Sequence, residues 1–133
     1  MDRITKEIYI GGQTSPEDIK LHKIKSVINL SSIPTEYSSE SLPINDSGEN
    51  DPAKLIEILK AIDSKIKKGE TPVYVSCLAG MSRSVVIVAL YLVYKKKSSS
   101  LEDAIDLVRS RHPQAMPSLE LLDFAKTKVI PLF

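Results

Sequence analysis

The chain has 133 residues, of which 42% are hydrophobic and 26% are charged, and its formal net charge is +1. A chain of this size and composition fits one globular domain, so we expect residues 1–133 to form a single catalytic or binding domain. The small net charge gives no electrostatic footprint for nucleic acid or for an anionic membrane, so we expect neither as a partner.

The N-terminus and the cysteine count indicate the compartment. Met1 to Lys6 lack the apolar core of a signal peptide, and the longest apolar run, Val85 to Tyr94, is only ten residues against about 20 for a membrane span. A single cysteine cannot form an internal disulfide, which suits a reducing environment. These features predict a cytoplasmic protein.

The first part of the chain alternates strand and helix signals. A short run rich in β-branched residues predicts a strand at Ile8–Ile10, and Ser15 followed by Pro16 is typical of a capped helix start. A second strand is predicted at Val27–Leu30, and the serine-rich stretch Ser38–Ser41 is interpreted as a surface loop.

The alternation continues to the C-terminus. Asp51 before Pro52 marks the next helix, and a third strand is predicted at Val73–Ser76. The apolar run from Val85 to Tyr94 has high β propensity but exceeds a typical strand, so the pattern alone leaves strand and helix open. Caps at Ser100 and Ser118 predict two further helices. This order of elements favours an α/β sheet with helices on its faces.

The only cysteine lies where the third predicted strand ends. Five residues separate Cys77 from Arg83, and among them Gly80, Ala79 and Ser82 are small enough for a tight loop. The backbone N–H groups of such a loop can converge on one oxyanion, and an arginine closes the ring with a bidentate fork. A helix beginning after the loop adds its partial positive charge, which stabilises a thiolate. The alternative is that Cys77 is an ordinary buried apolar residue.

The segment from Cys77 through Arg83 to Ser84 resembles the signature loop of the cysteine-dependent protein phosphatases, and in detail that of the compact dual-specificity branch. The resemblance implies an α/β fold with a central, mixed, mainly parallel sheet of four to five strands flanked by helices. It also implies that the run from Val85 to Tyr94 is a central buried helix. Similarity to the family extends to segments Ile8–Gly12, Lys25–Leu30, Ala104–Arg109 and Met116–Leu122.

The resemblance implies a chemistry as well. Cys77 would be the nucleophile of a metal-independent and cofactor-independent protein phosphatase that forms a phosphocysteine intermediate, and Ser84 would hydrogen-bond its thiolate. The substrates implied are phosphoproteins carrying phosphotyrosine, with phosphoserine and phosphothreonine as further candidates, acted on by a monomer. The residues implied to bind the phosphate are Leu78, Ala79, Gly80, Met81, Ser82 and Arg83. Since the loop brings no lysine or second arginine, inositol polyphosphates and RNA triphosphate ends are disfavoured.

A leaving alkoxide or phenoxide needs a proton donor, and three carboxylates precede the loop. Asp51 has a structural task as a helix cap, and Glu49 lies in what reads as a solvated turn. Asp46 follows an apolar stretch, and its position resembles that of the family's general acid. We therefore favour Asp46, with an Asx-turn role as the alternative.

The chain departs from the family at Ser76, where a histidine commonly precedes the nucleophile. Serine donates a hydrogen bond but carries no positive charge, so the thiolate would be less stabilised. This keeps a second function open, a catalytically weak phosphotyrosine-binding module. Sulfur or arsenate transfer on Cys77 is a third, although arsenate reduction usually recruits further thiols. His22 and His112 have no ligand-like spacing, so no metal is assigned.

Overall fold

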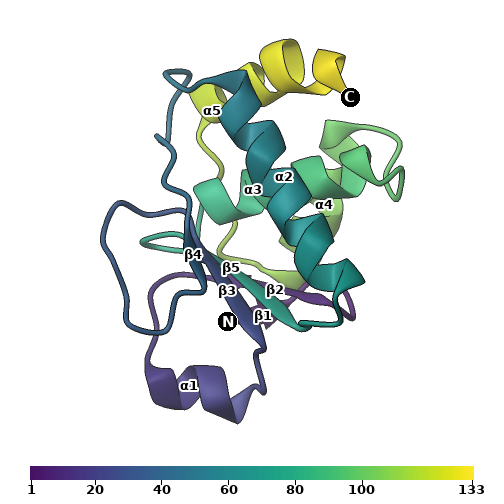
Figure 1. The fold of residues 1–133 in the computed structure, drawn as a ribbon. Coiled ribbons are helices and arrows are strands. Elements are labelled where there is room, and N and C mark those ends of the chain that lie inside the picture. Colours follow the sequence, from purple (N-terminus) through teal and green to yellow (C-terminus); the bar gives the residue numbers. More distant parts are fainter.

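The computed structural model describes residues 1–133 and contains one sheet of five strands in the order β1-β2-β5-β3-β4 (Figure 1). Only β1 runs antiparallel to its neighbour, and the other pairs are parallel. This confirms the predicted fold class. The strands are β1 (Asp2–Arg3), β2 (Ile8–Gly11), β3 (Ser26–Asn29), β4 (Glu40–Ser41) and β5 (Val73–Ser76).

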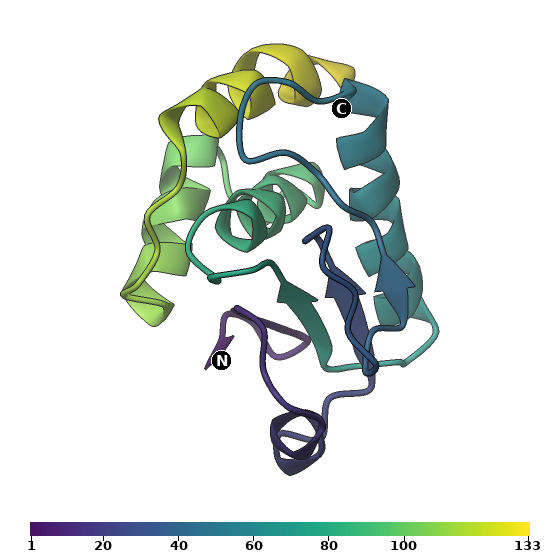
Figure 2. The same ribbon diagram turned by 90° about the vertical axis from the view of Figure 1, so that its left-hand side faces the viewer.

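Helices cover both faces of the sheet. Figures 1 and 2 place α1 on one side and the other helices on the opposite side. None of the helices combines the length and the apolarity that crossing a bilayer requires. The helices are α1 (Pro16–Leu21), α2 (Pro52–Lys67), α3 (Arg83–Tyr94), α4 (Leu101–Arg111) and α5 (Leu119–Phe124), followed by a π-helical turn (Ala125–Val129) and a 3-10 turn (Ile130–Leu132).

Helix α3 lies at the centre of the core and resolves the ambiguity of its sequence. It packs against α2, α4, α5 and the central strands, and every residue from Ser84 to Leu92 is buried. A helix enclosed on all sides needs apolar residues around its whole circumference. The β-branched composition is therefore overridden by burial, and the helix predicted for this run is confirmed.

Each predicted helix start has its cap. The side chain of Ser15 accepts a hydrogen bond from the Asp18 N–H, and Asp51 accepts one from Ala53. Ser100 and Ser118 cap α4 and α5 in the same way. Each of these bonds satisfies one of the free N–H groups in the first helical turn, which typically stabilises a helix by about 1 kcal/mol.

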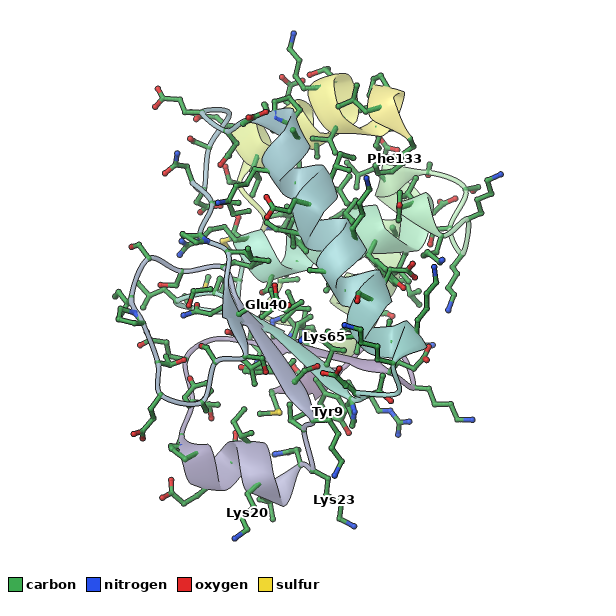
Figure 3. The ribbon with its side chains drawn as sticks, in the orientation of Figure 1. Tyr9, Lys20, Lys23, Glu40, Lys65 and Phe133 are labelled. Atoms are coloured by element: carbon green, nitrogen blue, oxygen red, sulfur yellow. The ribbon has the colours of Figure 1, made fainter.

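Two strands were not predicted, and one of them corrects the interpretation of Ser38–Ser41 as a loop. Glu40 and Ser41 form β4 and pair in parallel with Ile28 and Asn29 of β3. The flanking backbone hydrogen bonds run from the Ser39 N–H to Val27 and from the Leu42 N–H to Asn29. Figure 3 also shows Lys65 of α2 and Glu40 close together, and their charged atoms lie 3.4 Å apart. A two-residue strand leaves no periodicity in the sequence.

A charged cluster joins α2 to the end of α3. The Asp63 carboxylate lies 2.8 Å from the ammonium of Lys67 and 3.0 Å from that of Lys95, and the Tyr91 hydroxyl donates to it at 3.1 Å. These contacts, the Lys67 bond first, lower the pKa of Asp63 from 3.8 to about 2. The carboxylate therefore stabilises the fold while it is ionised.

We expect Asp63→Asn to lower the free energy of unfolding at pH 7 by on the order of 1 kcal/mol. Because the folded pKa is depressed, this stabilisation is present above the unfolded pKa near 3.8 and is lost as pH falls through about 2. The difference between wild type and variant in urea denaturation should thus be smaller at pH 3 than at pH 7. An equal difference at both pH values would contradict this. The control is Glu102→Gln, which breaks an exposed pair with Lys126.

Candidate active site

Cys77 lies at the middle of the sheet, immediately after β5, whose neighbours are β2 and β3. Ligands of open α/β sheets bind at this end, beyond the carboxyl ends of parallel strands. Cys77 is 2% exposed, and its Sγ is 3.4 Å from the Oγ of Ser84. Since Ser84 is the second residue of α3, the sulfur lies at the positive end of the central helix.

The loop from Cys77 to Ser82 turns three of its carbonyl groups outward. The Leu78 oxygen accepts from the Gln13 N–H at 3.1 Å, and the Met81 oxygen accepts from the Met116 N–H at 2.8 Å. Between them, the Gly80 oxygen is 2.6 Å from Nε2 of His112. Figure 2 shows the segment between α4 and α5 running beside this loop.

Because three carbonyl groups of the loop point outward, the directions of the N–H groups that follow them are also set. The peptide bonds of the loop are trans, so the N–H that follows each carbonyl points in the opposite direction. The N–H groups of Ala79, Met81 and Ser82 are thus directed away from the three contacts. No backbone N–H from residue 78 to residue 82 donates a hydrogen bond within the protein. Such a group of free donors is an anion-binding arrangement.

The loop can pack against the end of β2 only because each of the two segments has a glycine at the point of contact. Gly80 has φ of +73°, and a Cβ at this position would lie 2.3 Å from the Gly12 nitrogen. In turn, a Cβ on Gly12 would lie 2.8 Å from the Leu78 carbonyl oxygen. The carbonyl of Gly12 also accepts a hydrogen bond from the buried Tyr74 hydroxyl. Burial, above all, raises the pKa of Tyr74, so the phenol stays a donor.

Asp46 lies beside the loop and is attached to it by Ser82. The Ser82 Oγ donates to Asp46 Oδ1 at 2.5 Å and accepts from the Ser118 N–H at 2.7 Å. This one hydroxyl links the Cys77–Ser82 loop, the segment bearing Asp46 and the start of α5. The sequence predicted Ser82 as a small residue of the phosphate-binding loop, and it gave no sign of the contact with Asp46 because the two residues are 36 positions apart.

The other two candidate carboxylates are placed differently. Asp51 accepts from the Ala53 N–H as the cap of α2. Glu49 is exposed. Both line a cavity of about 540 Å³ together with Asp46 and Arg83. Of the three acids, only Asp46 is hydrogen-bonded to the Cys77–Ser84 segment.

Arg83 begins α3 and is partly buried, and its guanidinium donates to the Ile44 carbonyl at 3.5 Å. The Arg83 side chain therefore lies next to the segment that carries Asp46. On the outer surface of the loop, the side chains of Leu78 and Met81 are 46% and 37% exposed. No group of three or more His, Cys, Asp or Glu side chains is placed to hold a metal ion.

His112 is the residue at this site that sequence reasoning passed over. It is 4% exposed and contacts Gly80 with one ring nitrogen and Asp2 with the other. In the sequence it is an isolated histidine that shares no motif with the loop, and its partners are 32 and 110 residues away. No local pattern signals such a contact.

Residues 8–124 match the family model described as the catalytic domain of dual specificity phosphatases. The chain belongs to this family. It is 29% identical over 140 residues to human dual specificity protein phosphatase 7, covering 94% of this chain and 33% of that protein. It is 31% identical over 107 residues to dual specificity protein phosphatase OPG106 of monkeypox virus, covering 75% of this chain and 63% of the viral protein.

Solved structures agree with the fold. Human DUSP28 superposes with a TM-score of 0.80 at 21% identity, covering 93% of this chain and 92% of that one. The Yvh1 phosphatase domain from Chaetomium thermophilum gives a TM-score of 0.81 at 23% identity, covering 94% and 92%. The chain spans about a third of the length of the human relative named above.

The glycine contact at the loop leads to a matched comparison. Gly69 and Gly80 both have φ of +73°, but a Cβ at Gly69 meets nothing within 4 Å. We expect Gly69→Ala to cost about 1 kcal/mol of stability from backbone strain alone. Gly80→Ala adds a clash with backbone and should cost more than about 3 kcal/mol. Thermal unfolding of both variants tests this, and equal losses would show that the loop can move away from β2.

Proposed function

We propose that this chain is a cysteine-dependent phosphatase that hydrolyses phosphate monoesters on proteins, phosphotyrosine above all. The observation that carries the proposal is the set of free N–H donors from Leu78 to Ser82, with the Cys77 sulfur at the start of α3. A dianion fits such donors, and the helix end favours both the dianion and a thiolate. Membership of the dual specificity phosphatase family supports the same conclusion.

In the first step the thiolate of Cys77 attacks phosphorus and forms a sulfur–phosphorus bond. The bond between phosphorus and the leaving oxygen breaks, and that oxygen takes the electron pair. Asp46, the carboxyl group attached to the loop through Ser82, gives its proton to this oxygen. The products of the step are the dephosphorylated side chain and phosphocysteine.

The charge on the transferring phosphoryl group is stabilised by groups already in place. The inward N–H groups of the loop and the guanidinium of Arg83 bind its equatorial oxygens. Because these donors are fixed by contacts outside the loop, such as that of Met116, they need little reorganisation when charge develops. Arg83 is at the N-terminal end of α3, so the rigid core sets its position.

In the second step water attacks phosphocysteine while Asp46, now ionised, takes a proton from the water. The sulfur–phosphorus bond breaks and inorganic phosphate leaves. The departing sulfur carries negative charge, and Ser84 is placed to donate a hydrogen bond to it at 3.4 Å. The thiolate and the carboxylic acid are thereby restored for the next cycle.

The surface of the loop favours a substrate with a single phosphate on a protein side chain. Leu78 and Met81, the exposed residues of the loop with large side chains, are apolar. They bring no cation for further phosphates, which polyphosphate substrates require. The relatives named dual specificity protein phosphatases support phosphoprotein substrates.

A binding module without turnover is the second candidate, since Ser76 stands where the family commonly has histidine. The placement of Cys77, Asp46 and Arg83 around one loop disfavours it, because a module that only binds needs no carboxylic acid at the leaving oxygen. The kinetics below separate the two.

We expect wild type to release phosphate from para-nitrophenyl phosphate and phosphotyrosine peptide in the presence of a chelator. Cys77→Ser should bind phosphopeptide without turnover. Asp46→Asn should lose about 100-fold or more in kcat on phosphothreonine and phosphotyrosine peptides and less on para-nitrophenyl phosphate, whose leaving group needs no proton. Glu49→Gln, in the same cavity, is the control. Equal losses of Asp46→Asn on good and poor leaving groups would assign the acid elsewhere, and no turnover by wild type would favour the binding module.

The role of Ser84 predicts a change of rate-limiting step. Ser84→Ala should slow hydrolysis of phosphocysteine more than its formation, so rapid mixing with para-nitrophenyl phosphate should show a burst of nitrophenol stoichiometric with enzyme. Ser110→Ala, an exposed serine on α4, should behave as wild type. A proportional slowing of burst and steady state would contradict the role.

A further inference from the structure

The imidazole of His112 is enclosed beside the phosphate loop with both nitrogens in use. Nε2 lies 2.6 Å from the carbonyl oxygen of Gly80, and Nδ1 lies 2.5 Å from Oδ2 of Asp2. The His112 side chain is 5% exposed, so the ring is enclosed by protein. β1 pairs with β2, which places Asp2 opposite Ile10 and within reach of His112.

These partners determine the protonation of the ring. A carbonyl oxygen only accepts, so Nε2 must carry a proton to bond Gly80. The Asp2 side chain is 35% exposed, which lets water hydrate its charge. An ionised carboxylate also only accepts, so a ring that bonds both partners carries a proton on Nδ1 as well. A ring protonated on both nitrogens is an imidazolium with a full positive charge.

The hydrogen bond between His112 and Gly80 acts on the loop through the peptide group that joins Gly80 to Met81. The bond from His112 holds the Gly80 carbonyl outward, and the trans peptide then turns the Met81 N–H to the opposite side. That N–H is one of the free donors of the loop. Hydrogen bonding to a cation also polarises this peptide and strengthens the N–H as a donor to an anion.

We propose that His112 is a positively charged positioning residue of the phosphate loop, held in the imidazolium form by Asp2. This rests on the proposed phosphatase function. The imidazolium of His112, paired with Asp2, places its positive charge behind the Gly80–Met81 peptide, whereas Ser76, before Cys77, carries none. The N-terminal strand is thereby part of the machinery that orders the site, although it is remote from Cys77 in sequence.

The first measurement is the charge state of the ring. In ¹⁵N-labelled wild type at pH 7, both ring nitrogens of His112 should show the NMR shifts of protonated imidazolium. In Asp2→Asn, the ring should be neutral with its proton on Nε2, because the Gly80 bond remains. A neutral His112 in wild type would overturn the proposal, and this result does not depend on turnover.

The second measurement is anion binding, followed by amide shifts during titration with inorganic phosphate. We expect phosphate affinity to fall about fivefold in Asp2→Asn, because the Met81 N–H becomes a weaker donor to the anion when the ring loses its charge. Asp103→Asn removes a carboxylate from an exposed position in the first turn of α4 and should leave the affinity unchanged. His112→Gln keeps one donor for Gly80 without the charge and should weaken binding as Asp2→Asn does.

The outcomes separate the two proposals. If Asp2→Asn and His112→Gln both bind phosphate with wild-type affinity, the proposal is overturned and His112 has only a structural role. With peptide substrate, the same variants should raise KM by about the factor seen for phosphate while kcat changes little. Absence of hydrolysis by wild type would refute the proposed function alone, since charge state and phosphate binding are measured without it.

Discussion

The site depends on the direction of a few peptide planes between Cys77 and Ser82. A planar trans peptide can offer its N–H to a ligand only if the preceding carbonyl is turned away and satisfied elsewhere. Here the satisfying donors are Gln13, which follows β2, and His112 and Met116, which both lie in the segment between α4 and α5. The loop is thus ordered by its surroundings as well as by its own Gly80, and distant parts of the fold contribute to an arrangement of free donors.

The sheet and α3 supply the fixed frame for this loop. β5 lies between two parallel neighbours, and its last residue, Ser76, pairs with Gly11 on one side and Asn29 on the other. The loop leaves this strand and enters a helix whose residues from Ser84 to Leu92 are buried. Both ends of the loop are therefore held by the core, and the distance from Cys77 to Ser84 is set by packing.

Local signals were sufficient for most of the fold, because each acts within a few residues. The caps at Ser15, Asp51, Ser100 and Ser118 and the three β-branched runs needed no knowledge of partners. Strands β1 and β4 carry no such signal, since two residues have no period and are held by pairing alone. In the site, motif spacing led to the Cys77–Arg83 loop, whereas the contacts of Ser82 and His112 became visible only when distant segments were placed side by side.

In the proposed mechanism, the attachment of Asp46 to Ser82 explains how a loop residue can act as the acid. The segment around it is closed on itself by the Asn50 side chain, which accepts from the Asn45 N–H and donates to the Asn45 carbonyl. That closure shapes the segment but does not fix its distance from Cys77. The Ser82 hydroxyl does so, because its two bonds, to Asp46 and to the Ser118 N–H, join Asp46 to the Cys77–Ser82 loop and to the start of α5.

A proton donor must stay within hydrogen-bond reach of the leaving oxygen while remaining hydrated enough to exchange its proton. An exposed carboxyl group attached through one hydroxyl meets both conditions, which a buried aspartate in the core would not.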